Sequence, residues 1–294
     1  MAKKPPTTHK LRFLPGSWAA FMLGYALCSF EPALATSLDC PAKQEAFAAD
    51  AVLRVDSAPG TDLRILAIGS SSTEGIGASA PAFAYPAQLQ ARLGALLGRP
   101  VEVDNSGVGG ETVRATVFRL KEALRTVKPH LVIWQVGTND AVTGEDEASF
   151  RDGVLDGVSA IRAANTPFVL LDPQFYPGLK DVARYEQYVR IVDDLGERNG
   201  AAVFSRYDLM KEWGAESNAL LRTMLSKDAF HMSDRGYGCL AQNLAADLAP
   251  LLRRRPAAID SSASARSSVA IEKTAAVGSI ASEKTTAAGS IVKY

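Results

Sequence analysis

The chain has 294 residues, of which 47% are hydrophobic, and its 32 basic and 32 acidic side chains balance. A balanced chain without a basic stripe and interleaved aromatic residues argues against a nucleic acid as partner. The three cysteines form no CxxC pair and no cluster with histidine, so a structural metal is not indicated, and no sequence motif calls for a cofactor.

The chain begins with a basic leader and an apolar run. Four basic residues within 1–12 precede apolar residues 13–30, and Ala33-Leu34-Ala35 supplies a cleavage site of the small-x-small type. This pattern predicts a signal peptide over residues 1–35, cleaved after Ala35, and hence a secreted or periplasmic protein. An uncleaved membrane anchor is the alternative, but Pro15-Gly16 interrupts the run. Cleavage would leave a net charge of −3 and no stable membrane insertion.

After a predicted N-terminal extension (36–60), short apolar runs alternate with amphipathic segments of helix length. The expected strands are 65–68, 101–103, 131–136, 168–171 and 201–204. The expected helices lie near 82–97, 111–126, 147–163, 180–198 and 235–252. Nearly continuous apolar strands spaced for crossovers are typical of a parallel sheet covered on both faces. We therefore predict one three-layer α/β/α sandwich with a mostly parallel five-stranded sheet over 61–253.

Two features flank this domain. Cys40 and Cys239 would remain after cleavage, and an even pair in an exported protein suggests a disulfide between the extension and a C-terminal helix. Two separate buried thiols are the alternative. Residues 254–294 are dominated by Ala, Ser, Thr, Gly and Lys, with too few large apolar side chains to offset the entropy of ordering. We expect this tail to be disordered.

Small and polar residues follow each of the first four expected strands. They are Gly-Ser-Ser-Ser-Thr at 69–73, Asn-Ser-Gly-Val-Gly-Gly-Glu-Thr at 105–112, Gly-Thr-Asn-Asp at 137–140 and Asp-Pro-Gln-Phe-Tyr at 172–176. Ligands of open parallel sheets bind beyond the carboxyl ends of the strands, so we expect the site at this edge. Serines after the first strand could supply a nucleophile on a tight turn, or they could simply cap the next helix.

The histidines narrow the choice of a base. His9 lies in the leader, and His130 lies where the chain enters a strand, so we expect His130 to be structural. His231 falls on a late loop, with Asp228 three residues upstream. If the chain performs base-assisted acyl chemistry, His231 is the expected base and Asp228 orients its ring. Capping of the following helix is the alternative role of Asp228.

The four blocks together resemble those of the SGNH hydrolases, also called the GDSL esterase/lipase family. The resemblance covers roughly residues 63–250 and implies the flavodoxin-like fold of that family. Gly-Ser-Ser-Ser-Thr stands for the first block, Gly-Gly-Glu-Thr for the second, Gly-Thr-Asn-Asp for the third, and Asp228-Ala-Phe-His231 for the last. The family order of all four blocks is the strong part of this resemblance.

The resemblance implies a role for each matched residue. Ser71 would be the nucleophile, with His231 and Asp228 completing the triad. The backbone N–H of Gly110 and the side-chain amide of Asn139 would join the N–H of Ser71 as donors to the oxyanion.

The first block departs from the family pattern. Ser70 stands where the family usually has Asp, so Ser70 and Ser72 remain alternative nucleophiles at this point. Asp140, beside Asn139, is expected to brace its loop rather than react.

The function expected on this basis is an exported serine esterase without a cofactor. Its substrate would be a small ester or an acylated glycan, from which it removes acetyl or other short acyl groups. The alternatives are a lysophospholipase or thioesterase, a non-catalytic carbohydrate-binding relative and an acyltransferase. A lipid hydrolase needs an apolar acyl channel, for which five side chains are candidates unless they only pack the core: Phe175, Tyr176, Tyr207, Trp213 and Met224.

Overall fold

A computed structural model describes residues 61–253 and five positions of the N-terminal extension, Cys40, Pro41, Phe47, Leu53 and Val55. The predicted signal peptide (1–35) and the predicted disordered tail (254–294) lie outside the described residues, as does most of the extension. Among the described helices, none is both long and apolar enough to span a bilayer.

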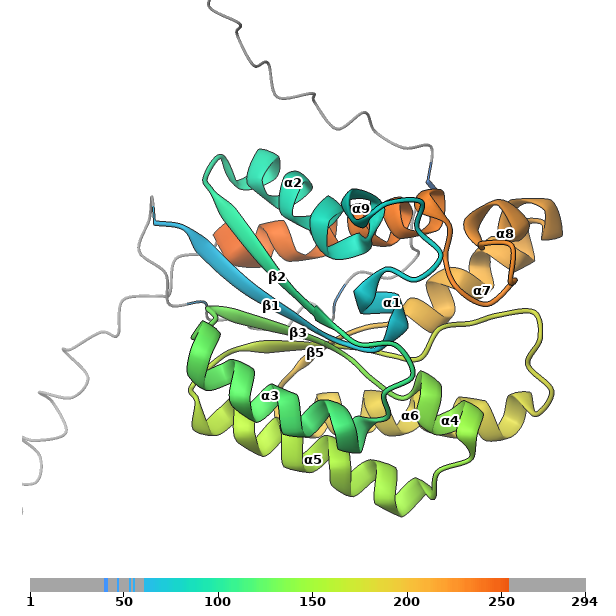
Figure 1. The fold of residues 1–294 in the computed structure, drawn as a ribbon, viewed down its shortest axis with the longest axis horizontal. Helices are drawn as coiled ribbons and strands as arrows, with labels where there is room; N and C mark the ends of the chain where they lie inside the picture. Colours follow the sequence, from blue (N-terminus) through green and yellow to red (C-terminus); the bar gives the residue numbers. More distant parts are fainter. Residues whose placement is uncertain (1–39, 42–46, 48–52, 54, 56–60, 254–294) are drawn as a thin grey trace, which may run out of the picture. The chain divides into compact units, whose positions relative to one another are not determined.

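The centre of the domain is one five-stranded sheet (Figure 1). Its strands are β1 (Leu63–Gly69), β2 (Val101–Gly107), β3 (Leu131–Gln135), β4 (Phe168–Leu171) and β5 (Ala202–Phe204). The order is β2-β1-β3-β4-β5, and every neighbouring pair is parallel. This is the flavodoxin-like order, whose topological switch point lies between β1 and β3. The predicted fold class is therefore confirmed.

Helices connect the strands and cover both faces of the sheet. The long ones are α2 (Tyr85–Leu97), α3 (Val113–Val127), α5 (Glu147–Ala163), α6 (Val182–Asn199) and α9 (Asp234–Arg253). Each corresponds to one of the five predicted helices, with ends that differ by at most three residues. The shorter ones are α1 (Ser71–Glu74), a 3₁₀ turn (Pro81–Phe83), α4 (Thr138–Thr143), α7 (Arg206–Glu216) and α8 (Asn218–Met224).

Helices α7 and α8 are absent from the expected set. Each begins at a serine whose side chain accepts a backbone N–H, Ser205 from Asp208 and Ser217 from Leu220. The Ser-x-x-Asp pattern at 205–208 is a start signal that could have indicated α7. The hydrophobic periodicity of α7 is weak because its buried residues include a charged one. Arg206, the first residue of the helix, is completely buried.

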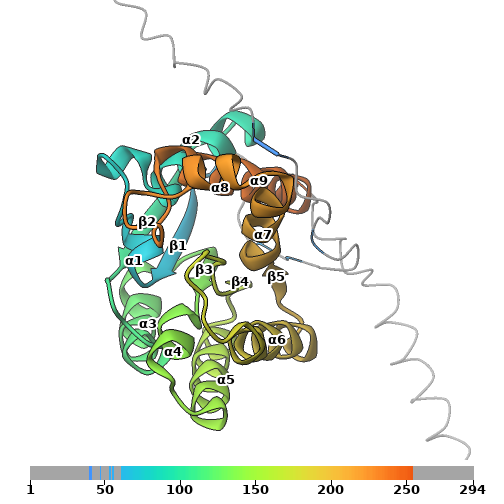
Figure 2. The same cartoon turned by 90° about the vertical axis from the view of Figure 1, so that its right-hand side faces the viewer.

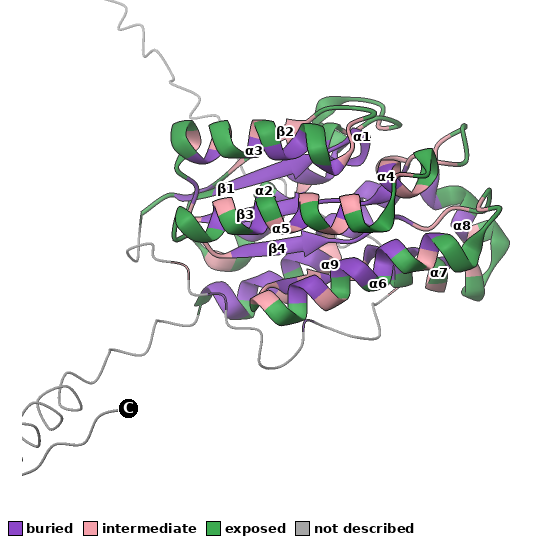
Figure 3. Ribbon diagram, turned by 90° about the horizontal axis from the view of Figure 1, so that it is seen from below, coloured by how far each residue is buried: buried purple, intermediate pink, exposed green. Residues whose placement is uncertain are grey.

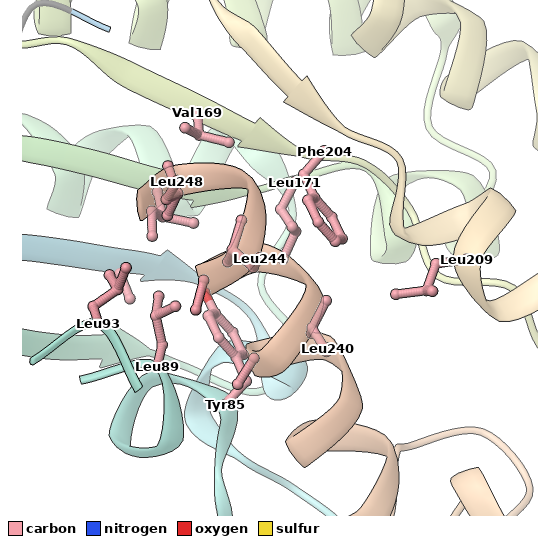
Figure 4. Packing of buried hydrophobic residues seen from close by; sticks show 14 of the residues in the cluster. Tyr85, Leu89, Leu93, Val169, Leu171, Phe204, Leu209, Leu240, Leu244 and Leu248 are labelled. Carbon is pink, nitrogen blue, oxygen red and sulfur yellow. The ribbon is translucent and has the colours of Figure 1, made fainter. Parts of the chain in front are cut away.

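The strands alternate their side chains between two cores. Ile65 and Ala67 of β1 belong to the core under α2, α7, α8 and α9, whereas Leu66 and Ile68 belong to the core under α3, α5 and α6. Buried strands consequently lie between helices whose outer faces are exposed (Figure 3). Figure 4 shows one of these cores, where leucines of α2 and α9 meet side chains of β4 and β5.

The N-terminal extension is attached to the domain. Cys40 forms a disulfide with Cys239 of α9, 199 residues later in the chain. Phe47 and Leu53 are buried in the core under α2 and α9, where the Phe47 ring packs edge-on against Phe204 at 6.0 Å. Of the two alternatives for the cysteines, the structure contains the disulfide.

Candidate active site

The serine turn follows β1 directly at the carboxyl edge of the sheet, which faces the viewer in Figure 2. Gly69 is required there because a Cβ would lie 2.6 Å from Thr73 Oγ1 and 2.7 Å from Gln135 Oε1. On β2, Gly107 is equally crowded, since a Cβ would overlap the backbone of Glu74. Two glycines thus let α1 lie directly on the strand ends, where Ser71 begins the helix.

Ser71, His231 and Asp228 form a continuous hydrogen-bonded chain. Ser71 Oγ lies 3.0 Å from His231 Nε2, and His231 Nδ1 lies 2.6 Å from Asp228 Oδ2. Ser71 is 7% exposed, and the side chain of His231 is 17% exposed. The structure therefore brings together three residues predicted from two separate blocks, the first and the last, in which Ser71 and His231 are 160 positions apart.

The loop before α9 fixes the carboxylate of Asp228. Its Oδ1 accepts the hydroxyl of Ser226 at 2.7 Å and the N–H groups of Phe230 and His231, each at 2.9 Å. Burial acts to raise the pKa of Asp228, but these bonds and the bond from the imidazole outweigh it and hold the pKa well below its ordinary value. Asp228 is therefore ionised at neutral pH, as a partner of an imidazolium must be.

The neighbouring serines are turned away from His231. Ser70 Oγ donates to Gln135 Oε1 at 3.0 Å, and Ser72 Oγ donates to Gln174 Oε1 at 2.8 Å. Both side chains point into the protein as parts of buried networks. Of the three serines that the sequence left as possible nucleophiles, Ser71 is the one paired with the imidazole.

The second block forms an uncrowded backbone turn at Gly110. Gly110 has a φ of +81°, which favours glycine, and a Cβ there would meet no atom within 4 Å. The preceding N–H, that of Gly109, donates to the carboxylate of Glu74 at 2.6 Å. Glu74 belongs to the same short helix as Ser71, so the Gly110 turn is tied to the nucleophile turn.

The third block places Asn139 on α4, half-buried at the same edge. Its Nδ2 donates to the carbonyl oxygen of Glu111 at 2.8 Å. A primary amide carries two N–H donors, so one remains for an oxyanion. The bond to Glu111 joins Asn139 to the loop of Gly110. The two predicted oxyanion donors, Gly110 and Asn139, are therefore held by the same loop.

An arginine that no motif singled out supports that loop. The Nε of Arg119 on α3 bonds the Glu111 carboxylate at 2.9 Å. Its guanidinium also donates to the carbonyl oxygens of Ser106 at 2.8 Å and Gly69 at 3.2 Å. Arg119 therefore joins the ends of β1 and β2 to the residue that holds Asn139.

Two further residues make structural contacts, although Asp140 supports a different segment from its own loop. Asp140 is buried, and its carboxylate accepts the N–H of Val113 at 2.9 Å, so it braces the start of α3; burial raises its pKa. His130 lies at the amino end of β3, where its Nδ1 accepts the N–H of Arg64 at 3.0 Å. Burial lowers the pKa of His130.

A hydroxyl, an imidazole and a carboxylate at the switch point of a parallel 2-1-3-4-5 sheet define the SGNH type of hydrolase. A family model described as the Non-GDSL lipase-like family matches residues 39–253, and the chain belongs to that family. Family and fold together place it among hydrolases that act on ester bonds. No protein of curated function matches the sequence.

Solved structures share the fold. TesA is 24% identical, with 64% of this chain and 99% of TesA covered at a TM-score of 0.56. The psychrotrophic esterase EstA from Pseudoalteromonas sp. is 17% identical, with 65% and 99% covered at 0.55. A variant of Axe2, an acetyl xylan esterase from Geobacillus stearothermophilus, is 22% identical, with 63% and 94% covered at 0.52.

Proposed function

We propose that the protein is an exported serine esterase that removes acetyl or other short acyl groups from a polysaccharide or cell-envelope glycan. The observation that carries the catalytic part is the 3.0 Å contact between Ser71 Oγ and His231 Nε2, with Asp228 on the other ring nitrogen. That arrangement activates a hydroxyl for attack on an ester carbonyl.

The proposed reaction proceeds through an acyl-enzyme. His231 takes the proton of Ser71 while Ser71 Oγ attacks the carbonyl carbon, and Asp228 stabilises the imidazolium. The N–H groups of Ser71 and Gly110 and the second amide hydrogen of Asn139 donate to the oxyanion. His231 then protonates the leaving alcohol, and water, activated by the same imidazole, releases the acid and frees Ser71.

Two observations support the finer parts of the proposal. The disulfide between Cys40 and Cys239 is typical of an oxidising compartment, which agrees with the predicted leader and with export. Three candidates for an acyl channel, Tyr207, Trp213 and Met224, are at most 2% exposed and pack in the core. The other two candidates, Phe175 and Tyr176, are half-buried, and their rings pack edge-on against Tyr207 and Tyr185. The packing of these side chains favours a short acyl group.

A lipid hydrolase or thioesterase is the second candidate. Val108 in the loop of Gly109 and Val142 on α4, the helix of Asn139, are 42% and 50% exposed. Such apolar side chains could contact an acyl chain. Turnover of aryl esters from acetate to palmitate separates the two candidates, since the proposal expects a maximum at acetate or propionate.

Replacement of the nucleophile tests the proposal itself. Ser71→Ala should lower turnover of a short-chain aryl ester by roughly 10³-fold or more and abolish labelling by a fluorophosphonate probe. The matched control is Ser159→Ala on the exposed face of α5, which should behave as the unmodified protein. Equal labelling of the Ser71→Ala variant, or no labelling of the unmodified protein, would contradict the catalytic assignment. The second outcome would favour a carbohydrate-binding relative.

A further inference from the structure

Gln174 connects the two halves of the site. It lies in the loop after β4 and has no exposed surface. Its Oε1 accepts the hydroxyl of Ser72 at 2.8 Å, and its Nε2 donates to the carbonyl oxygen of Phe230 at 2.7 Å. Ser72 follows the nucleophile and Phe230 precedes the base, so one amide bridges the immediate neighbours of both.

The orientation of this amide follows from chemistry. The carbonyl oxygen of Phe230 can only accept a hydrogen bond, so the NH₂ group of Gln174 must face it. The amide oxygen then faces the hydroxyl of Ser72, which can donate. Exchange of the two amide atoms would place two acceptor oxygens in contact.

Gln174 is itself held on both sides of its α-carbon. Its N–H donates to Thr138 Oγ1 at 3.3 Å, and its carbonyl oxygen accepts the hydroxyl of Tyr185 at 2.7 Å. The same loop supports the histidine loop a second time, because the ring of Tyr176 packs edge-on against Phe230 at 4.8 Å. The bridge is therefore anchored to α4 and α6 and does not depend on a mobile side chain.

Among the described residues, a second buried glutamine, Gln135, supports only the nucleophile turn. Gln135 Oε1 accepts the N–H of Ser70 at 2.8 Å and its hydroxyl at 3.0 Å, which fixes the nucleophile turn to β3. Gln135 makes no such bond to the histidine loop in the described part of the chain. Gln174 thus supplies the contact that relates one half of the site to the other.

We infer that Gln174 is a positioning residue that sets the separation between Ser71 Oγ and His231 Nε2. The inference rests on the proposed function of Ser71 and His231. Proton transfer needs the two atoms at hydrogen-bond distance, and a displacement of about 1 Å can cost roughly 10²-fold in rate. Substrate binding does not require the same alignment, so the effect should fall on kcat.

The first test removes the hydrogen bonds at similar length and volume. Gln174→Met should lower kcat for an aryl acetate by about 10- to 100-fold with KM changed by less than about threefold. Gln187→Met, the same exchange on the exposed face of α6, is the matched control and should leave both constants unchanged. Unchanged kcat in a folded Gln174→Met variant would overturn the inference.

The second test separates positioning from simple packing through pH. In Gln174→Glu an ionised carboxylate cannot donate to the Phe230 carbonyl, whereas the protonated acid can. Burial favours the protonated acid at low pH, so the ratio of this variant's kcat to that of the unmodified protein should fall as pH rises. A ratio that is constant over a pH range in which the introduced carboxyl group ionises would mean that the side chain only fills space, and would overturn the inference even if Gln174→Met does not fold.

A double-mutant cycle identifies the contact. Ser72→Ala removes the donor to Gln174, so its loss of kcat and that of Gln174→Met should combine to less than their product. Independent losses would contradict coupling through this bond. Fluorophosphonate labelling of the unmodified protein and of Ser71→Ala is run in parallel. Absent labelling of the unmodified protein refutes the proposed function, whereas normal labelling with a normal Gln174→Met variant refutes only the inference.

Discussion

Asn139 has two tasks at one amide group. One hydrogen of its Nδ2 is committed to the carbonyl oxygen of Glu111 at 2.8 Å, and the other is the proposed oxyanion donor. Asn139→Ala should therefore lower kcat by roughly 10²–10³-fold with a small effect on KM. Asn218→Ala, at an exposed position of α8, is the control. A loss below about threefold in a variant with unchanged thermal unfolding would mean that the amide does not face the oxyanion.

Asp172 is a completely buried acid near the same edge of the sheet. Burial raises its pKa to about 8; the N–H of Tyr207 and the attraction of Arg206 oppose the shift without cancelling it. Arg206 donates to the backbone oxygen of Asp172 at 2.8 Å rather than to its carboxylate. Ser205 Oγ has one hydrogen but lies near two carboxylates, 3.1 Å from Asp172 and 2.9 Å from Asp208. A proton on Asp172 satisfies all of these oxygens.

The sign of the resulting pH dependence follows from the raised pKa. The folded chain retains the Asp172 proton up to about pH 8, whereas an unfolded Asp loses it near about pH 3.9. The contribution of Asp172 to the free energy of unfolding is complete below the pKa of the unfolded state, and it is lost as the pH rises toward 8. The free energy of unfolding should fall by at most about 1.4 kcal/mol per pH unit in this window.

Asp172→Asn tests this dependence because the amide keeps the shape but does not titrate. Denaturant unfolding between about pH 5 and 8 should show a shallower decline in this variant than in the unmodified protein. Parallel curves would show that Asp172 is ionised in the folded protein.

Helix α5 approaches the sheet through a glycine. A Cβ on Gly157 would overlap the indole ring of Trp134 on β3, which is fully buried. Gly157→Ala should therefore lower the free energy of unfolding by about 1–3 kcal/mol, because a packed core does not accept an added methyl group.

Gly94 in α2 is the matched position for this prediction. A Cβ there has its nearest contact at 3.7 Å, with the carbonyl oxygen of Arg99. Gly94→Ala should stabilise the protein by about 0.5–1 kcal/mol, since alanine loses less backbone entropy in a helix. Thermal unfolding of the two variants should shift in opposite directions. Equal shifts would mean that the space around Gly157 adapts.

The same packing explains which elements the sequence predicts well. The strand 168–171 and the helix 147–163 have the predicted bounds because a buried strand requires a continuous apolar run and α5 has a clear apolar face. Helix α7 buries both apolar residues and Arg206, so its pattern of hydrophobicity does not reveal one face. Its start is encoded locally by Ser205, and its place is decided by contacts with distant residues.

At the scale of the whole molecule, one disulfide bond closes a loop that contains most of the chain. The Cys40–Cys239 disulfide spans 199 positions, and a loop of that length loses up to about 5 kcal/mol of unfolded-state entropy in the chain-entropy description. The double variant Cys40→Ser and Cys239→Ser should unfold at a lower temperature than the oxidised protein and should not respond to a reductant. An equal unfolding temperature for the oxidised and reduced protein would contradict a stabilising role.

The residues that local backbone geometry demands could be found without a structure. Gly110 and the Asp228–His231 spacing each satisfy a short-range requirement, a positive φ and an acid three residues from its imidazole. Such requirements involve residues close together in the chain, so the turn glycine and the pair of acid and base could be recognised from the sequence. The resemblance pointed to Ser71 and left Ser70 and Ser72 as alternatives. The contact of Ser71 with the imidazole is seen only in the structure, because the start of α1 determines where each of the three side chains points.

The supports of the site belong to the tertiary structure. Gln174 reaches residues 102 and 56 positions away, and Gln135 reaches one 65 positions away. The hydrogen-bond partners of a glutamine cannot be predicted from the sequence, because these bonds form only once β1, β3 and β4 pack side by side. The order of the sequence blocks indicated the reacting groups, whereas tertiary packing determined the distances between them.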